Sequence, residues 1–542
     1  MTPQSLLLVA TLALPLAMLA ACVVRTLRRH MPGWLAMAPV PGIAAALFSV
    51  DAPPFAFGGG SVRLALALDL PGALLLGVAA LLWSAAGAYA ASYFGDSPKA
   101  ERFAVCWLMA LAGCLGVFVA ADMVSLYALL GLLTLGATGL VLHDDTPRAR
   151  RAAAVYVGLA LTGESLALVG FILLAAAMPG DSLLVRDAAA ALSASPQRDL
   201  TLALLVGGFG IKAGLVPLHV WMPLAHSAAP VPASSVLSGA VVKVGIIGLI
   251  RFLPFDAPLA AWGEPLTALG MFTALYAVAM GVTQKHPKAV LAYSSVSQMG
   301  VVVAVLGMGM AAADETVPVL AAFYAAHHVL VKGALFLAFG VVAATGSARV
   351  TPTLALATVL AAGLGGLPFT GGALAKFAVK APLGDGLMGM LGVVSAIGTT
   401  LLMLHFVVRL RAHTATEPEA TAGAGLTLPW LAMALASIAV PWALYCAAPP
   451  GALPDPLAPK YLWEALWPVA LGAVLAVVLT RAGDRLPRIP EGDIAVAIDV
   501  AAHTAITASR RFEHVDGWLR RWPTAGVALL GLAIALGAAL LR

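Results

Sequence analysis

Charged residues are scarce in this chain: Asp, Glu, Lys and Arg together make up 11% of its 542 residues. A soluble globular domain carries about 25%, so the composition excludes a soluble protein. Hydrophobic residues instead make up 61%, and the mean hydropathy is +0.96. These values indicate a polytopic membrane protein. The net charge of +5 comes mostly from loops, where it bears on orientation and does not suggest nucleic acid.

Cysteine is scarce too, and no pattern of metal ligands is visible. Cys22, Cys106, Cys114 and Cys446 lie in separate apolar segments without CxxC or Cys/His spacing, so neither an iron–sulfur cluster nor a zinc site is indicated. A nucleotide-binding loop and a flavin motif are also lacking. We therefore expect no cofactor and no catalytic chemistry in this chain, and any redox chemistry would belong to partner proteins.

A positively charged segment before the first hydrophobic run, which would mark a signal peptide, is absent. The cations Arg25, Arg28 and Arg29 instead follow this run, Ser5–Val24. That order predicts an uncleaved anchor with its N-terminus outside.

Hydrophobic runs of about 20 residues, the length that spans a bilayer, predict about sixteen helices. The predicted spans are 4–24, 33–50, 66–94, 103–121, 123–142, 152–178, 199–221, 233–253, 258–282, 289–311, 316–345, 353–381, 386–410, 427–447, 462–480 and 523–541. We therefore expect an all-α polytopic membrane protein with about 14–16 transmembrane helices.

Lys and Arg collect in alternate loops, as the positive-inside rule requires. The odd-numbered loops hold Arg25, Arg28, Arg29, Lys99, Arg102, Arg148, Arg150, Arg151, Lys285, Lys288, Arg349, Arg411, Arg481, Arg485 and Arg488. The even-numbered loops hold few cations: Arg63, Arg186, Arg198 and Lys460, with Arg251 at a helix end. This pattern predicts cytoplasmic odd loops and external termini in a bacterial cytoplasmic (inner) membrane.

The segment 494–522 is predicted to be an amphipathic helix before the last span. Its apolar residues recur at three- and four-residue steps, and its charged residues fall between them. Two interpretations remain open: the helix rests on the cytoplasmic membrane surface among the lipids, or it is a strap that docks a neighbouring subunit.

Four lysines lie within predicted spans. They are Lys212, Lys243, Lys332 and Lys376. A charged side chain at this depth costs several kcal/mol, at least about 2.5–3.5 on insertion scales, and usually faces a hydrated interior or a partner. Burial disfavours the charged amine and a nearby carboxylate favours it, so such a lysine can bind and release a proton. The alternatives are snorkelling to an interface and a fixed structural ion pair.

Histidines lie close to these lysines in the sequence. His219 follows Lys212 by seven residues and is expected on roughly the same helical face, although Pro217 lies between them. His327 and His328 precede Lys332, and His328 shares its face. They are candidate proton relays, with satisfied core histidines as the alternative.

Two predicted helices, the seventh and the twelfth, are broken by Pro217 and by Gly366 with Pro368. Such breaks must line a cavity or be covered by protein, and matched breaks indicate two inverted repeats with an ion site at each. We expect five-helix repeats at 103–255 and 256–412. The flanking parts are N-terminal helices at 1–102, C-terminal helices at 413–489, and the surface helix with the final span at 490–542.

Four motifs resemble the antiporter-like membrane subunits of respiratory complex I, Mrp-type cation/proton antiporters and membrane-bound energy-converting hydrogenases. They are GIKAGLVPLHVWMPLAHSAAPVPASSVLSGAVVKVG at 210–245, QKHPKAVLAYSSVSQMG at 284–300, HHVLVKGALFLAFG at 327–340 and GLPFTGGALAKF at 366–377. The resemblance covers roughly residues 65–410. It implies proton transfer through the four lysines along a central hydrated axis, coupled to partner subunits.

The sequence departs from this family in its fifth predicted helix. Most members have a glutamate there, paired with the lysine of the seventh, but SLYALLGLLTLGA places Gly131 at that position. The nearby carboxylate is Glu164, in LALTGESLALVG, which we expect to be the partner of Lys212. The alternative is a neutral, hydrogen-bonded carboxylic acid. His286 likewise stands where many relatives have an acidic residue.

Other polar residues lie near predicted span ends. Asp69 and Asp122 lie at the starts of the third and fifth predicted helices, where helix capping is favoured over a proton-entry role. His405 and Arg409 are candidates for a proton exit.

The leading functional hypothesis is a proton-translocating membrane subunit of a multi-subunit complex that is either redox-driven or an antiporter; proton transport alone and cation/proton antiport both stay open. One alternative is a membrane subunit that energises uptake of dissolved inorganic carbon with a zinc-protein partner. A second is a mainly structural anchor of a hydrogenase or dehydrogenase complex.

Overall fold

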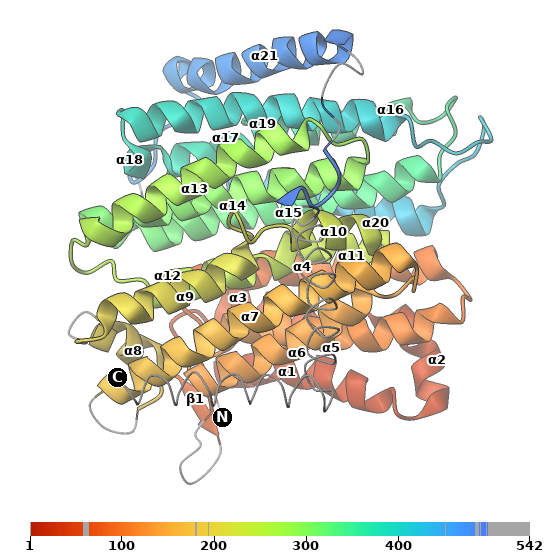
Figure 1. The fold of residues 1–542 in the computed structure, drawn as a ribbon. Helices are drawn as coiled ribbons and strands as arrows, with labels where there is room; N and C mark the ends of the chain where they lie inside the picture. The colour runs from red at the N-terminus through yellow and green to blue at the C-terminus, as the bar shows by residue number, and fades with distance from the viewer. Residues whose placement is uncertain are drawn as a thin grey trace, which may run out of the picture. The chain divides into compact units, whose positions relative to one another are not determined.

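The computed structural model describes residues 2–57, 64–178, 182–192, 195–449, 451–482, 487, 489–494 and 496. Met1–Glu491 form one compact unit and Gly492–Arg542 a second. The first unit is mainly helical, and its long helices lie side by side (Figure 1).

Twelve helical elements precede Lys243 in the described residues. They are α1 (Pro3–Ala21), α2 (Arg25–Trp34), α3 (Val40–Phe48), α4 (Leu70–Phe94), α5 (Lys99–Val119), α6 (Met123–Val141), α7 (Pro147–Ala177), α8 (Val185–Leu192), α9 (Arg198–Ala213), α10 (Trp221–Ala228), α11 (Val231–Val236) and the π-helix η1 (Leu237–Val241). The later helices are α12 (Lys243–Phe252), α13 (Ala260–Gly281), α14 (Pro287–Ala312), α15 (Val317–Ala343), α16 (Thr351–Gly365), α17 (Gly371–Ala378), α18 (Lys380–Leu383), α19 (Leu387–Arg411), α20 (Ala424–Cys446) and α21 (Pro459–Ala482).

Eleven helices in the described residues are long and apolar enough to cross a membrane, which confirms a multi-pass membrane protein. The structure differs at the second predicted span, 33–50, because α2 and α3 are separate helices and α3 has nine residues. Prolines are the physical reason: Pro39 precedes α3 and Pro41 lies in its first turn. The predicted surface helix, 494–522, and the final span, 523–541, lie outside the described residues.

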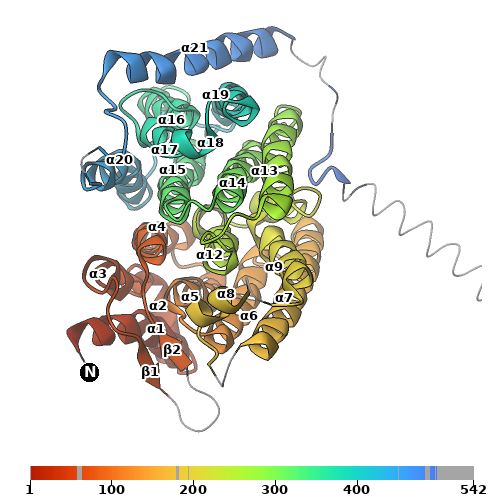
Figure 2. The same ribbon diagram turned by 90° about the vertical axis from the view of Figure 1, so that its left-hand side faces the viewer.

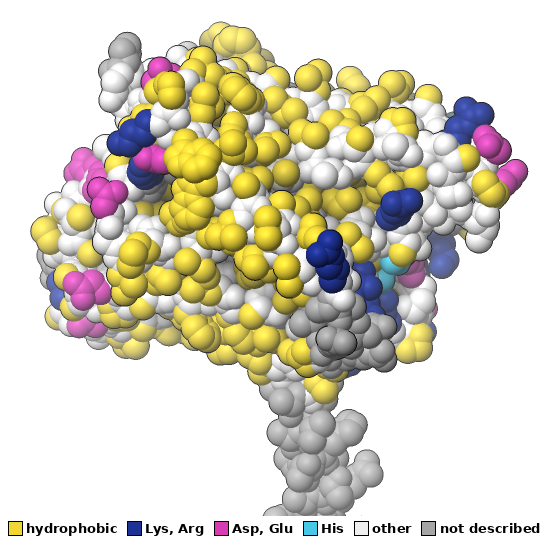
Figure 3. All heavy atoms as spheres, turned by 90° about the horizontal axis from the view of Figure 1, so that it is seen from above, with side chains coloured by type: hydrophobic (Ala, Val, Ile, Leu, Met, Phe, Trp, Pro, Cys, Tyr) yellow, Lys and Arg dark blue, Asp and Glu magenta, His cyan; other side chains and the backbone are white. Residues whose placement is uncertain are grey.

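The centre of the unit is formed by α12, α14 and α15, which Figure 2 shows end-on and surrounded by other helices. In the most apolar stretches of α14 and of the helix Val231–Phe252, every residue is buried, against 22% in α1 and α21. A helix that is apolar on all sides must be enclosed by others. The outer helices present a broad hydrophobic surface, and the charged side chains visible in Figure 3 lie mostly toward its ends.

Both predicted helix breaks are confirmed. The helix α9 ends before Gly214, whose φ of +80° is left-handed, and α10 begins at Trp221. The helix α16 ends before Gly366, with φ +108°, and α17 begins at Gly371. Glycine adopts this conformation without the steric cost that other residues meet. The division into two repeats, 103–255 and 256–412, remains a prediction.

A third interruption was not predicted. Within the predicted eighth span, the helix widens into η1 immediately before α12. Single π-helical turns are rare and frequently lie at functional sites. This turn places Lys243 at the start of α12.

Capping by the two aspartates is confirmed. Asp69 accepts a hydrogen bond from the Gly72 N–H at 3.1 Å and caps α4, and Asp122 accepts one from the Ser125 N–H at 2.7 Å and caps α6. Asp122 also accepts the Ala65 N–H at 2.6 Å, which ties α6 to strand β2 (Leu64–Leu66). This strand pairs with β1 (Phe55–Phe57) in a small antiparallel hairpin, with Phe55 opposite Leu66.

Candidate functional site

The first buried lysine, Lys212, forms an ion pair with Glu164. Lys212 lies in the last turn of α9 and Glu164 in α7, and their Nζ and Oε1 atoms are 2.8 Å apart. The residues are 4% and 5% exposed. Gly163 and Gly208 let the two helices approach, because a Cβ on Gly208 would lie 2.6 Å from the Gly163 carbonyl oxygen. The expected contact is present, while its role in proton transfer stays a prediction.

A threonine from α6 joins this pair. The Thr134 hydroxyl accepts a hydrogen bond from Lys212 Nζ at 2.6 Å and donates one to Glu164 Oε1. Gly131 lies almost one turn earlier on α6, and a Cβ there would meet no atom within 4 Å. The carboxylate therefore comes from α7, and α6 contributes a hydroxyl. Sequence reasoning missed Thr134 because a threonine is ordinary in an apolar helix.

The second buried lysine, Lys243, contacts a histidine. Its Nζ hydrogen-bonds His328 Nδ1 of α15 and donates to the Ser238 carbonyl oxygen of η1 at 3.0 Å. Both Lys243 and His328 are fully buried. A π-helical turn disturbs the regular backbone hydrogen bonding, and here the Ser238 carbonyl accepts from the lysine. The pairing of His328 with Lys243 across helices was not foreseen from the sequence.

The third buried lysine, Lys332, lies one turn after His328 on α15, as predicted. Its Nζ donates to the Leu291 carbonyl oxygen at 2.9 Å and to the Ser294 hydroxyl, both on α14. Within the described ranges, the ion pair with Glu164 is the only one that any of the four predicted lysines makes. Lys243 and Lys332 are thus held by neutral polar groups.

Two predicted relay histidines lie away from these contacts. The expectation that His219 shares a helical face with Lys212 is wrong, because α9 ends at Ala213 and His219 lies in the break that Gly214 and Pro217 create. The His219 ring packs edge-on against Tyr276, with centroids 5.5 Å apart. His327 faces α17: a Cβ on Gly372 would lie 3.2 Å from its Nε2 atom.

The fourth lysine, Lys376, lines a cavity of about 340 Å³ after the second break. Buried polar groups from α15 and α19, including Tyr324 and Ser395, line the same cavity. The exposed Asp385 and the Lys380–Glu464 ion pair, whose atoms are 2.6 Å apart, also line it. The cavity thus connects Lys376 to the protein surface.

A string of hydrogen bonds leads from this cavity into the core. The Tyr324 hydroxyl donates to Gln298 Oε1 at 2.7 Å, and Gln298 Nε2 donates to the Thr399 hydroxyl at 3.0 Å. The quoted motif at 284–300 contains Gln298 but gave no reason to single it out.

The proposed exit residues lie elsewhere. His405 is nine residues beyond Ala396, the last α19 residue that lines the cavity, a rise of about 14 Å. Its Nε2 contacts the Gln284 carbonyl oxygen at 2.9 Å. His405 and Arg409 therefore do not belong to the same opening as Lys376.

Metal ligands do not gather in the part of the chain that the structure describes: no three His, Cys, Asp or Glu side chains come together as a metal ion would need. The expectation that the chain carries no cofactor stays a prediction.

The fold and the site together define an antiporter-like membrane subunit: an all-α bundle with two broken helices and lysines in its core. A family model described as NADH:quinone oxidoreductase/Mrp antiporter, TM, matches residues 120–403. The chain belongs to this family.

Individual relatives agree with this assignment. Hydrogenase-4 component B of Escherichia coli (strain K12) is 30% identical over 308 residues, which are 54% of this chain and 44% of that protein. NADH-quinone oxidoreductase subunit N of Desulforudis audaxviator (strain MP104C) is 33% identical over 327 residues, 58% of this chain and 63% of that protein. The chain thus spans less than two thirds of the length of these relatives.

A solved structure of the Mrp complex from Dietzia sp. DQ12-45-1b is similar in fold. Its TM-score is 0.76 at 23% identity, and the match covers 100% of this chain and 63% of that chain. This likeness confirms the fold class that the sequence predicts.

Proposed function

We propose that this chain is a proton-translocating subunit of a larger membrane complex. Protons pass along the Lys212–Glu164 pair, the Lys243–His328 pair, Lys332 and Lys376, and leave through the cavity beside Lys376. His219 and His327 are the less direct members of the predicted pathway. The family and the named relatives, which are components of hydrogenase and quinone-oxidoreductase systems, support this function.

The observation that carries the proposal is the chemistry of the lysine contacts. A fixed structural role would favour a permanent counterion for each buried ammonium, since an uncompensated buried charge is costly. Lys243 and Lys332 instead contact an imidazole and a hydroxyl, groups that both accept and donate protons. Such partners suit amines that exchange their protons.

We infer that the chain lies in a bacterial cytoplasmic membrane with its N-terminus outside. We also infer that its partners are other membrane subunits, one of them docked through 494–522. Neither alternative function, inorganic carbon uptake or a mainly structural anchor, has a specific contact in its favour. The structural-anchor alternative rested on the absence of a glutamate at Gly131. Glu164 pairs with Lys212 instead, so this absence no longer supports it.

The test uses the complex extracted in mild detergent and reconstituted into vesicles that report internal pH. Lys243→Ala is expected to slow proton movement at least 10-fold without loss of co-purifying subunits. The matched control is Lys460→Ala, because Lys460 is exposed and contacts the ring of Tyr461. Proton movement by Lys243→Ala at the control rate contradicts the pathway.

A further inference from the structure

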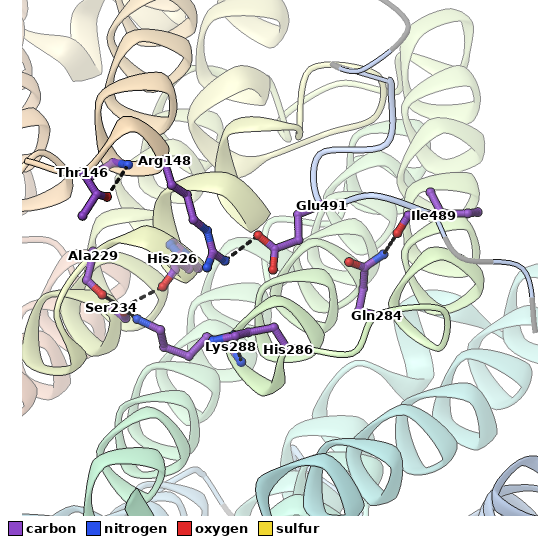
Figure 4. Close-up of polar contacts among 11 residues, drawn as sticks. Thr146, Arg148, His226, Ala229, Ser234, Gln284, His286, Lys288, Ile489 and Glu491 are labelled. Carbon is purple, nitrogen blue, oxygen red and sulfur yellow. Dashed lines mark hydrogen bonds and ion pairs between the residues drawn. The ribbon is translucent and has the colours of Figure 1, made fainter. Parts of the chain in front are cut away.

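A fourth buried lysine, which the predicted pathway does not include, lies at the start of α14. Lys288 is 6% exposed. Its Nζ donates to the Ala229 carbonyl oxygen at 2.5 Å and to the Ser234 hydroxyl at 3.3 Å, and both acceptors come from the turn between α10 and α11 and the helix that follows it. Figure 4 shows this amine pointing toward Ser234 and Ala229. The loop charges predict that the start of α14 faces the cytoplasm.

Lys288 has no carboxylate in contact within the described residues. The groups that face it are Arg148 of α7, Asp144 of the α6–α7 loop, Glu491 beyond α21, His286 at its own helix start, His226 of α10 and the Phe339 ring of α15. Glu491 is held by Arg148, with 2.6 Å between their atoms. Glu491 is therefore neutralised by another cation, and the hydrogen bonds of Lys288 go to neutral oxygen acceptors.

Buried hydroxyls lead inward from Lys288. Ser238 lies four residues after Ser234 in the same run of helix, a rise of about 6 Å. The Ser238 hydroxyl is 2.7 Å from that of Ser295 on α14, and the Ser238 backbone carbonyl accepts the hydrogen bond from Lys243. The neighbouring Ser294 contacts Lys332. All four serines are fully buried. One hydroxyl contacts Lys288, one contacts Lys332, and the other two hydrogen-bond each other beside Lys243.

We propose that Lys288 is a proton-binding site at the entrance of the pathway, with the buried hydroxyls of Ser234, Ser238, Ser294 and Ser295 between it and the central lysines Lys243 and Lys332. This inference rests on the proposed function and adds the residue that receives protons from one water phase. Each step moves one proton: the ammonium of Lys288 gives up a proton and becomes a neutral amine, and the amine of Lys243 or Lys332 gains one. A serine hydroxyl passes a proton on by accepting one and donating another.

The experiment replaces Lys288 by two residues in the reconstituted complex. Lys288→Gln keeps a hydrogen-bond donor but cannot carry a proton. Lys288→Arg keeps the positive charge, but arginine does not release its proton in proteins. Both variants are expected to move protons at least 10-fold more slowly than wild type while all subunits co-purify. The control is Lys285→Gln, which changes an exposed lysine in the same loop and is expected to leave the rate unchanged.

Near-normal transport by Lys288→Arg overturns the inference, because a fixed charge would then be sufficient. This result also decides the matter if Lys288→Gln fails to assemble. The proposed function is judged separately by Lys243→Ala: loss of transport in that variant, with normal transport in both Lys288 variants, rejects the entrance and leaves the pathway standing.

Discussion

At the scale of single residues, the position of one carboxylate distinguishes this chain from the family pattern. Glu164 reaches Lys212 from α7, and Thr134 of α6 bridges the two. Glu164→Gln leaves Lys212 buried without a counterion, and breaking a buried pair in this way costs about 3–5 kcal/mol. We expect proton movement to fall at least 10-fold and the melting temperature of the complex to drop.

A second substitution tests whether the carboxylate can be supplied from α6. Gly131 and Thr134 are three residues apart and share a face of this helix, and the space around Gly131 is open. Adding Gly131→Glu to the Glu164→Gln variant is therefore expected to restore part of the lost transport. The control adds Gly158→Glu, since Gly158 on α7 also has open space around it. Equal transport by the two double variants would count against the pairing.

A prediction on pH concerns His286, which lies outside the membrane spans. Burial lowers the pKa of His286 to about 3, and the nearby positive charges of Lys288 and Arg148 and the His413 ring add to this effect. An unfolded chain binds this proton below about pH 6.5, so folding loses stability as pH falls from about 6.5 toward 3. We expect the melting temperature in detergent to decrease over this range.

His286→Asn identifies the contribution of this residue. His286 caps α14 by accepting the Lys288 N–H, and asparagine caps helices equally well but does not titrate. The variant should therefore show a smaller decrease in melting temperature between pH 6.5 and pH 4. His143, whose pKa burial lowers to about 4, accounts for part of the remaining decrease. An unchanged pH profile in His286→Asn would reject this origin.

At the scale of helices, the site depends on how closely α7 and α9 approach. A Cβ on Gly208 would lie 2.6 Å from a backbone oxygen of α7, so the helices must separate. Gly208→Ala is expected to lengthen the Lys212–Glu164 contact and to reduce transport several-fold. Gly207→Ala is the matched control, because its Cβ meets only the end of the Leu166 side chain at 3.3 Å. Equal effects of the two variants, measured as transport rate per assembled complex, would contradict this account.

The helices show what the sequence could and could not predict. Pro217 and Gly366 predicted the two breaks. Proline lacks the N–H that a helix needs, and glycine readily adopts the left-handed backbone conformation that ends one. The residues of η1, LSGAV at 237–241, did not predict a π-helix, because π-turns have no local sequence signature of comparable strength. The hydrophobic run 33–50 also counted as one span, although α2 and α3 are separate helices.

The site shows the same limit. The four lysines could be found because a cation is costly in an apolar helix, and Glu164 because it was the one carboxylate nearby. Thr134 and the buried serines could not, because their contacts join helices far apart in the sequence, and hydroxyl residues are common in membrane helices. The prediction that His219 shares a helical face with Lys212 was wrong for a simpler reason. It extended helical periodicity through Pro217, although α9 ends at Ala213.

At the scale of the whole molecule, the loop charges predict which end faces the cytoplasm. Ser97→Cys lies in an odd-numbered loop and Asp256→Cys in an even-numbered one, and both positions are in non-helical segments. Because Cys446 is exposed, both changes are made together with Cys446→Ser. A membrane-impermeant maleimide applied to intact cells should label only Asp256→Cys. Labelling of Ser97→Cys alone would reverse the orientation.

The central claim is that the lysines inside the helix bundle carry protons through it. The variant Lys212→Ala tests this claim most directly. The measurement is the rate of proton movement in vesicles that contain the intact complex, compared with the exposed-site variant Lys99→Ala at equal subunit content. The account predicts that Lys212→Ala abolishes the movement and that Lys99→Ala retains it. Equal rates in the two preparations would contradict it.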